Sequence, residues 1–184
     1  TDIDSGAALS PSFLASLPPG DRRTVVLPRL GEEILAVREP PLEMGFVAGA
    51  NPAATAPDSG KVAAGLDALG FLVVVEQFQT ATTALADVVL PCTTYLETDD
   101  LVDSYGHHWL SLTRRVIEPV GEARSDAEIL EGLAARLGFG DALVGSADEW
   151  IERMIEGSGV SLDQLRGAAV LRPGATPVPF ADGR

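Results

Sequence analysis

The chain has few of the residues that metal clusters, disulfides and nucleic-acid-binding surfaces require. Its one cysteine, Cys92, excludes an intrachain disulfide and cannot alone hold a structural zinc or an iron–sulfur cluster. Its one lysine, Lys61, stands in a chain of 184 residues with a net charge of −14, which argues against binding to nucleic acid or to an acidic membrane. No apolar run approaches the roughly 20 residues that a membrane-spanning helix needs. The remaining composition, 46% hydrophobic and 22% charged, is that of an ordinary globular domain.

Three short apolar runs predict a parallel sheet. They are Met44–Ala48, Phe71–Val75 and Val88–Leu90, each too short for a globular helix. Such runs are typical of strands buried on both faces of a sheet. The segments between them have helical composition, so we expect helical crossovers, including one between the second and third strands. The predicted fold class is therefore α/β: a three-layer, open, mainly parallel sheet with helices on both faces, like that of a dinucleotide-binding domain, plus a C-terminal helical extension.

Capping residues and apolar spacing predict the other elements. Asp126 is the predicted N-cap of a helix that runs to Leu137. The further expected elements are a short strand Thr24–Leu27, a helix Leu30–Val37 ended by Pro40–Pro41, a helix from Asp58 or Ser59 to Leu69, an edge or crossing strand over Tyr105–Leu112, a helix Asp148–Ile155 and a short helix from Ser161.

Polar and turn-forming residues follow the predicted strands. Asn51 lies in the turn after the first strand, and its amide can both donate and accept hydrogen bonds. Glu76 follows the second strand, where an acidic side chain commonly accepts ribose hydroxyls. Thr80 and Thr82 lie near the start of the expected crossover helix, where free N–H groups favour phosphate. These residues predict a nucleotide site at the carboxyl ends of the strands; the alternative is that they act only as turn and cap residues.

Three segments then resemble, in their order and spacing, one known family. They are GANPAATAPDSGKV, VVVEQFQTATTALADVVLPCTTYLETDD and EPVGEARSDAEILEGLAARLGF. These segments resemble the molybdopterin oxidoreductase family, which includes dimethyl sulfoxide reductases, formate dehydrogenases and periplasmic nitrate reductases. The resemblance covers about Leu30 to Phe139. It implies the third of the family's four domains, one of the two α/β domains that hold the bis-molybdopterin guanine dinucleotide cofactor.

The resemblance also implies which residues contact one guanosine arm of that cofactor: Asn51, Val75, Glu76, Thr98 and Asp126. A carboxylate such as Asp126 can pair with the two donors of a guanine edge, although a role as helix N-cap explains the same residue equally well. Glu76 replaces the more usual aspartate and is one methylene longer. Thr98 stands where some relatives carry a lysine, so a charged contact to the phosphate is missing at that position.

Other reactive residues have simpler interpretations. Cys92 is interpreted as a small packed side chain, because unpaired cysteine is commonly a buried hydrophobe. His107 and His108 are adjacent and would point to opposite faces of a strand, so they cannot chelate one metal together. The acidic residues Glu97, Asp99, Asp100 and Asp103 lack the spacing of a calcium loop, and we interpret them as a solvated loop.

The function implied is therefore that of a piece of a larger enzyme. Residues 1–29 are interpreted as a connector from a preceding domain, residues 30–140 as the cofactor-binding domain, and residues 141–184 as a helical extension and linker. The intact enzyme would carry out two-electron chemistry at molybdenum or tungsten, with an iron–sulfur cluster in an N-terminal domain outside this chain. The isolated chain is expected to be inactive.

An alternative stays open, in which the chain is a non-catalytic scaffold domain from the large iron–sulfur subunit of an NADH-quinone oxidoreductase-like complex. The expected partners are other domains of the same polypeptide and an electron-transfer subunit, without nucleic acid and without membrane insertion by this chain. The cytoplasm is the expected location, with the periplasm as the alternative.

Overall fold

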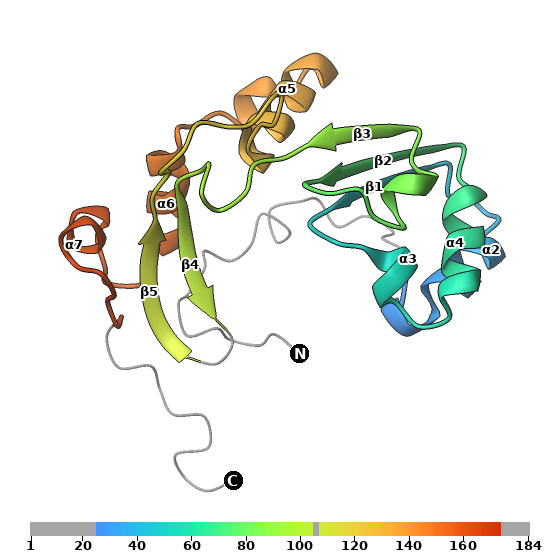
Figure 1. Ribbon diagram of the computed structural model, residues 1–184, viewed down its shortest axis with the longest axis horizontal. Coiled ribbons are helices and arrows are strands. Elements are labelled where there is room, and N and C mark those ends of the chain that lie inside the picture. The colour runs from blue at the N-terminus through green and yellow to red at the C-terminus, as the bar shows by residue number, and fades with distance from the viewer. Residues whose placement is uncertain (1–24, 105–106, 174–184) are drawn as a thin grey trace, which may run out of the picture. The chain divides into compact units, whose positions relative to one another are not determined.

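The computed structural model describes residues 25–104 and 107–173 (Figure 1). The chain divides into two compact units. The sheet unit contains described residues 25–94 and 119–133, and the hairpin unit contains described residues 95–104, 107–118 and 134–173. Each unit has its own hydrophobic core.

The sheet unit is built on three parallel strands, β1 (Met44–Ala48), β2 (Phe71–Glu76) and β3 (Val88–Pro91). They are hydrogen-bonded in the order β1-β2-β3. In the register, Ala48 pairs with Val75, which pairs with Leu90 on the other side. The three predicted strands and their parallel pairing are thus confirmed, and β2 is the central strand.

Helices cover one face of this sheet. They are α2 (Leu30–Ala36), α3 (Pro52–Thr55) and α4 (Ser59–Asp67), and they lie together on one side of the strands in Figure 1. Leu72 and Val74 point to the same face because side chains alternate along a strand, and they pack against Val62 and Leu66 of α4. The predicted combination of a parallel sheet with helices is confirmed, whereas helices on both faces stay a prediction.

Two glycines allow α2 and α4 to approach closely. A Cβ atom added to Gly31 of α2 would lie 2.3 Å from the backbone carbonyl carbon of Lys61 in α4. A Cβ atom on Gly65 would lie 3.1 Å from the Gly31 carbonyl oxygen. The two helix backbones are therefore in direct contact, which a larger side chain at Gly31 would prevent.

The connection between β2 and β3 differs from the prediction. It contains only a short 3₁₀ turn, η2 (Thr83–Leu85), in place of a crossover helix. Threonine side chains there bond to nearby backbone and so compete with helix formation. The Thr80 N–H donates to Thr83 Oγ1 at 2.6 Å, and the Thr83 hydroxyl donates to the Thr80 carbonyl at 2.9 Å.

The start of the chain also differs from the prediction. Val26 is followed by a 3₁₀ turn, η1 (Leu27–Arg29), in place of a strand, and Thr24 lies outside the described residues. The proline at position 28 explains the turn, because proline fits the first turn of a helix and has no N–H to donate to a strand. The predicted helices that follow begin where expected, at Leu30 for α2 and after the N-cap Asp58 for α4.

The hairpin unit pairs β4 (Asp100–Ser104) antiparallel with β5 (His107–Thr113). The predicted strand over Tyr105–Leu112 corresponds to β5, and residues 105–106 lie outside the described residues. The sequence did not predict the partner strand β4. Two helices, α6 (Ala147–Ile155) and α7 (Leu162–Gly167), pack on the hairpin. The core of this unit consists of Leu101, Leu110, Ile151, Ile155, Leu162 and Leu165.

The remaining elements are α5 (Asp126–Leu137), which begins in the sheet unit, and η3 (Gly140–Ala142). The helices predicted at Asp126–Leu137, at Asp148–Ile155 and after Ser161 are present. Within the described ranges, no helix is both long enough and apolar enough to cross a membrane.

The close contact of α2 and α4 leads to a prediction on stability. Gly31→Ala should lower the free energy of unfolding of the sheet unit by about 2–3 kcal/mol, because the added methyl group meets backbone that cannot move aside cheaply. The matched control is Gly60→Ala in α4. There the nearest atom lies 3.9 Å away, so alanine should be neutral or stabilise by up to about 1 kcal/mol.

Hydrogen exchange of the β2 amides measures this effect in the sheet unit directly. Tryptophan fluorescence would not, since both tryptophans, Trp109 and Trp150, belong to the hairpin unit. Equal stability of the two alanine variants would contradict the direct contact of α2 and α4.

Candidate functional site

The carboxyl ends of β1, β2 and β3 meet at one edge of the sheet, because the three strands are parallel. Asn51 follows β1, Glu76 is the last residue of β2, and Thr93 follows β3. Glu76 pairs directly with Pro91 in the register. Asn51 and Glu76, which the sequence predicts at the carboxyl ends of the strands, thus lie along one edge, and Thr93 lies there with them. In open α/β sheets this edge is where ligands bind.

A fourth segment extends this edge beyond β3. Arg124 forms a parallel bridge with Cys92. The Arg124 N–H donates to the Pro91 carbonyl at 3.1 Å, and the Thr93 N–H donates to the Arg124 carbonyl at 3.1 Å. Since neighbouring strands lie about 4.8 Å apart, the edge from Asn51 to Arg124 spans about 14 Å. We call the row formed by Asn51, Glu76, Arg124 and Asp126 the carboxyl edge.

The Asn51 side chain is held by Thr82. Asn51 Oδ1 accepts a hydrogen bond from the Thr82 hydroxyl at 2.7 Å and another from the Thr82 N–H at 3.3 Å. The Thr82 side chain is fully buried, and its Oγ1 also accepts the Ala53 N–H at 3.1 Å. Within the described ranges, the Asn51 amide nitrogen donates to no protein group. The two amide hydrogens of Asn51 are therefore available to a ligand.

Glu76 is partly engaged with its own turn. Its Oε1 accepts the Gln77 N–H at 2.8 Å, which leaves the second carboxylate oxygen available. The Gln77 amide donates to the Thr93 carbonyl at 2.9 Å and so ties the ends of β2 and β3 together. Val75 is only 1% exposed, so its side chain packs in the sheet and any contact with a ligand would fall on its backbone.

Asp126 is not the cap of its helix, which corrects the sequence prediction. Ser125 and Glu128 form the capping pair: Glu128 Oε2 accepts the Ser125 N–H at 2.8 Å, and Ser125 Oγ accepts the Glu128 N–H at 3.3 Å. A serine with a glutamate three residues later satisfies two free N–H groups reciprocally. Asp126 is the first residue of α5, exposed, and its carboxylate accepts no hydrogen bond from the described residues.

The threonines between β2 and β3 do not form a phosphate site. Thr82 and Thr83 are buried, and Thr80 is half-buried and bonded to Thr83. The prediction that Thr80 and Thr82 offer free N–H groups to phosphate is therefore wrong. The Thr80 N–H donates to Thr83 Oγ1, and the N–H and hydroxyl of Thr82 both donate to Asn51 Oδ1.

Thr98 belongs to the hairpin unit, whereas the other predicted site residues belong to the sheet unit. Its hydroxyl is half-buried and donates to the Asp99 carbonyl at 3.4 Å. Its predicted contact to the cofactor stays a prediction.

The sequence did not predict the roles of two residues at this site, Thr82 and Arg124. Thr82 was assigned to the wrong role because its burial could not be known from its neighbours in the sequence. Arg124 lies exposed on the carboxyl edge, beside β3, although 32 residues separate it from Cys92. The segments that contain ADVVLP and GEARSD pair here, and this long-range contact is what places Arg124 at the edge.

The lysine of the sheet unit is engaged elsewhere. Lys61 Nζ lies 2.9 Å from Asp58 Oδ2 at the start of α4. Hydrogen bonds from the Lys61 side chain and backbone lower the pKa of Asp58, and the same side-chain hydrogen bond raises the pKa of Lys61. The cation of the carboxyl edge is therefore Arg124.

The acidic residues of the hairpin unit do not form a metal site. Glu97 is only 5% exposed, which corrects its interpretation as part of a solvated loop. Asp99 accepts the Arg115 N–H at 2.9 Å, and Asp100 accepts the Leu101 N–H at 2.7 Å. In the part of the chain that the structure describes, no group of three His, Cys, Asp or Glu side chains could hold a metal ion.

Cys92 and His107 both lie within strand pairings or strands. Cys92 is half-buried in its bridge with Arg124, which agrees with a packing role. His107 Nδ1 accepts the Trp109 N–H at 3.2 Å within β5.

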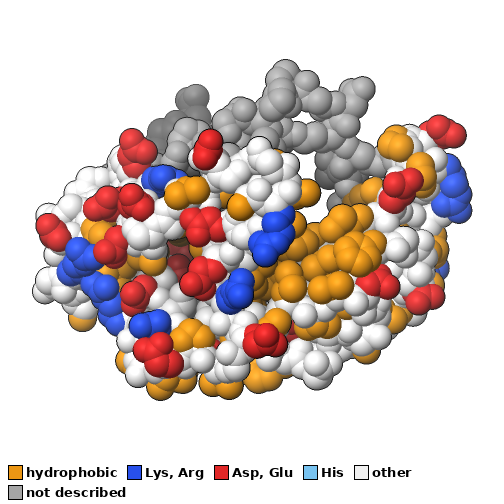
Figure 2. Space-filling view, turned by 90° about the horizontal axis from the view of Figure 1, so that it is seen from above, with side chains coloured by type: hydrophobic (Ala, Val, Ile, Leu, Met, Phe, Trp, Pro, Cys, Tyr) orange, Lys and Arg blue, Asp and Glu red, His pale blue; other side chains and the backbone are white. Residues whose placement is uncertain are grey.

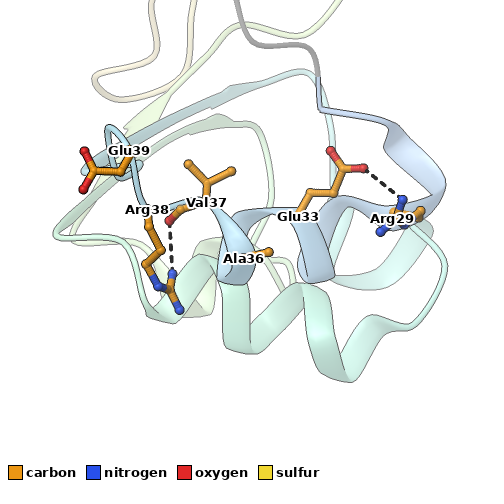
Figure 3. Close-up of a pocket in the computed structure, with 6 residues that line it drawn as sticks. All are labelled: Arg29, Glu33, Ala36, Val37, Arg38 and Glu39. Atoms are coloured by element: carbon orange, nitrogen blue, oxygen red, sulfur yellow. Dashed lines mark hydrogen bonds and ion pairs between the residues drawn. The ribbon is translucent and has the colours of Figure 1, made fainter.

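A surface depression in the sheet unit lies away from the carboxyl edge. It has a volume of about 400 Å³ and is lined by α2, by Arg29 and by the loop that follows α2 (Figure 3). Arg29 and Glu33 form an ion pair at 3.6 Å, and Arg38 donates to the carbonyl of its neighbour Val37 at 3.0 Å (Figure 3). None of the predicted site residues lines this depression.

The capping pair of α5 gives a second prediction. Ser125→Ala should destabilise the first turn of α5 by about 1 kcal/mol, because it removes the cap. Asp126→Ala should cost less, a few tenths of a kcal/mol from the lost helix-dipole interaction. Hydrogen exchange of the amides in the first two turns of α5 checks this order. A larger destabilisation by Asp126→Ala than by Ser125→Ala would show that Asp126 is the cap.

The chain is similar to known proteins of one family. The model of the molybdopterin oxidoreductase family matches residues 28–136. The chain is 37% identical over 154 residues to the probable oxidoreductase YoaE of Bacillus subtilis, which covers 83% of this chain and 22% of that protein. It is 34% identical over 137 residues to trimethylamine-N-oxide reductase 1 of Escherichia coli, which covers 72% of this chain and 16% of that protein.

A solved structure has the same fold. Acetylene hydratase from Pelobacter acetylenicus matches with a TM-score of 0.71 and 24% identity, over 86% of this chain and 22% of that one. The chain thus spans about a fifth of the length of the relatives it matches. Because the family match covers more than half of the chain, this chain belongs to the molybdopterin oxidoreductase family.

Proposed function

We propose that this chain binds one guanosine arm of a bis-molybdopterin guanine dinucleotide cofactor, as part of a larger oxidoreductase. The observation that carries the proposal is the order of polar groups along the carboxyl edge. Asn51 offers donors at one end, Glu76 offers an acceptor in the middle, and Arg124 with Asp126 stands at the other end. A guanosine diphosphate group has the matching order of phosphate, ribose and base.

The base end of the edge complements guanine. Guanine presents an N1–H donor, an exocyclic amine donor and a carbonyl acceptor on one side of its ring. The exposed Asp126 carboxylate can accept from both donors, and a charge-assisted pair of this kind is strong and directional. Arg124, two residues earlier, offers N–H donors for the carbonyl. Adenine lacks the N1–H and so cannot form the same hydrogen bonds with Asp126 and Arg124.

The rest of the edge suits ribose and phosphate. The free carboxylate oxygen of Glu76 is placed just past a buried strand, where acidic residues accept ribose hydroxyls. Thr98 supplies no charge to the phosphate, so the phosphate would rely on neutral donors, and the Asn51 amide at the far end of the edge from Asp126 can supply them. The residues present therefore fit the nucleotide end of the cofactor.

In the intact enzyme, the bound metal would supply two-electron redox chemistry, and this chain would position its cofactor. Other parts of the polypeptide would enclose the remainder of the cofactor, because one edge contacts only one arm. An electron-transfer subunit is the expected partner of the whole enzyme. The purified chain should therefore contain no stoichiometric molybdenum or tungsten, and elemental analysis finding either metal at one equivalent would contradict this part of the proposal.

The proposal predicts guanine selectivity. Titration of the chain with GDP, followed by amide chemical shifts, should show weak binding, because the open edge does not enclose the ligand. The shifts should map to Asn51, Glu76 and the first turn of α5. ADP should bind at least about tenfold more weakly, the equivalent of one lost hydrogen bond. Equal binding of ADP and GDP would exclude a guanine site, and no binding of either would favour the scaffold alternative.

Asp126→Asn tests the base contact in particular. Asparagine keeps the size of the side chain but cannot accept from both guanine donors, so the dissociation constant for GDP should rise by about tenfold or more. The Ser125–Glu128 cap stays in place, so stability should hardly change. The matched control is Asp141→Asn, an exposed acid of the hairpin unit, which should leave GDP binding unchanged. Unchanged binding by Asp126→Asn would remove Asp126 from the site.

A further inference from the structure

We propose that Thr82 is a positioning residue that turns the Asn51 amide hydrogens outward as a phosphate-binding donor pair. This inference rests on the proposed function for the identity of the ligand. The orientation of Asn51 depends only on hydrogen bonds within the protein.

The polarity of the hydrogen bonds follows from two backbone N–H groups that can only donate. The Thr82 N–H lies 3.3 Å from the terminal atom of Asn51, so this atom must be the carbonyl oxygen and not the amide nitrogen. The Ala53 N–H lies 3.1 Å from Thr82 Oγ1, so that oxygen accepts there. Its hydroxyl hydrogen is then free to donate to Asn51 Oδ1 at 2.7 Å. The network permits one orientation of the amide.

The same network explains why Asn51 does not cap α3. Asn51 occupies the N-cap position of this short helix but makes no side-chain cap hydrogen bond. Its usual target in that role would be the N–H of the second or third residue of the helix. Thr82 Oγ1 takes the N–H of Ala53, which is the second residue. A buried threonine from a distant loop thus does the capping and leaves the asparagine free to face a ligand.

The burial of Thr82 makes this arrangement rigid. The residue is fully buried and lies 31 positions from Asn51 in the chain, so the bond fixes the loop after β1 to the loop after β2. An asparagine amide on the surface normally loses rotamer freedom when it binds a ligand. Here the protein has already fixed that rotamer, which reduces the cost of binding.

The test compares three variants of the whole chain. Thr82→Val keeps the shape and removes the hydroxyl, whereas Thr82→Ser keeps the hydroxyl. Asn51→Asp keeps the shape and both bonds from Thr82 but replaces the outward amide with a carboxylate oxygen. The ligands are GDP, GMP and guanosine, which share the base and differ in phosphate.

We expect Thr82→Val to weaken GDP binding by about tenfold and to leave guanosine binding within about twofold of the original chain. Thr82→Ser should restore GDP binding. In Asn51→Asp, GDP should no longer bind more tightly than guanosine, because the new carboxylate repels the phosphate. The melting temperature of this variant should stay unchanged. If Thr82→Val fails to fold, this charge reversal decides the question: preserved preference for GDP in Asn51→Asp would overturn the proposal.

A ligand-free measurement separates this inference from the proposed function. The side-chain amide signals of Asn51 in a ¹⁵N spectrum should shift in Thr82→Val and return toward their original positions in Thr82→Ser. If no guanine nucleotide binds the original chain, the proposed function fails. The positioning role is then tested by these amide signals alone. Identical Asn51 amide signals in the original chain and in Thr82→Val would overturn it. If Thr82→Val weakens the binding of guanosine as much as that of GDP, Thr82 has only a general structural role, and this result would also overturn the positioning role.

Discussion

The parallel pairing of β2 with both of its neighbours is the constraint on which the site depends. Leu72, Val73, Val74 and Val75 are all buried, so β2 has apolar side chains on both faces and can only be a central strand. A slip of one residue would turn every side chain to the opposite face. The carboxylate of Asp87 accepts the Leu72 N–H at 2.7 Å and ties the start of β2 to the residue that precedes β3. With the register fixed, the strand ends and the groups that follow them have fixed positions.

The two ends of the carboxyl edge share one device. At each end, another residue caps the helix, and the polar side chain that could have capped it stays available to a ligand. Thr82 takes the N–H that Asn51 would otherwise accept, and Ser125 with Glu128 caps α5 in place of Asp126. A side chain used as a cap has its acceptor oxygen directed at its own helix. Separation of the two tasks therefore leaves groups at the edge that are oriented toward solvent or a ligand.

The sequence predicted those features that depend on local pattern. Short apolar runs were sufficient for the three strands, and the parallel order followed from the connections between them. The crossover after β2 was mispredicted because Thr80 and Thr83 bond to each other's backbone, and composition does not reveal which threonines of this segment are buried. The pairing of Arg124 with Cys92 is a long-range contact, so no local signal could place Arg124 beside β3. The cap of α5 was recoverable, since Ser125 and Glu128 have the spacing of a capping box.

The charge of the chain bears on how such an edge could hold a phosphate. A net charge of −14 opposes an anionic ligand at long range, although salt screens charges beyond about 8 Å under physiological conditions. Short-range groups must then supply the affinity, and Glu76 and Asp126 repel phosphate while they attract donors. The carboxylates therefore suit the ribose and the base, and a neutral amide suits the phosphate. A pre-oriented asparagine fits that demand, because its two N–H groups donate without a counter-charge and Thr82 already holds their direction.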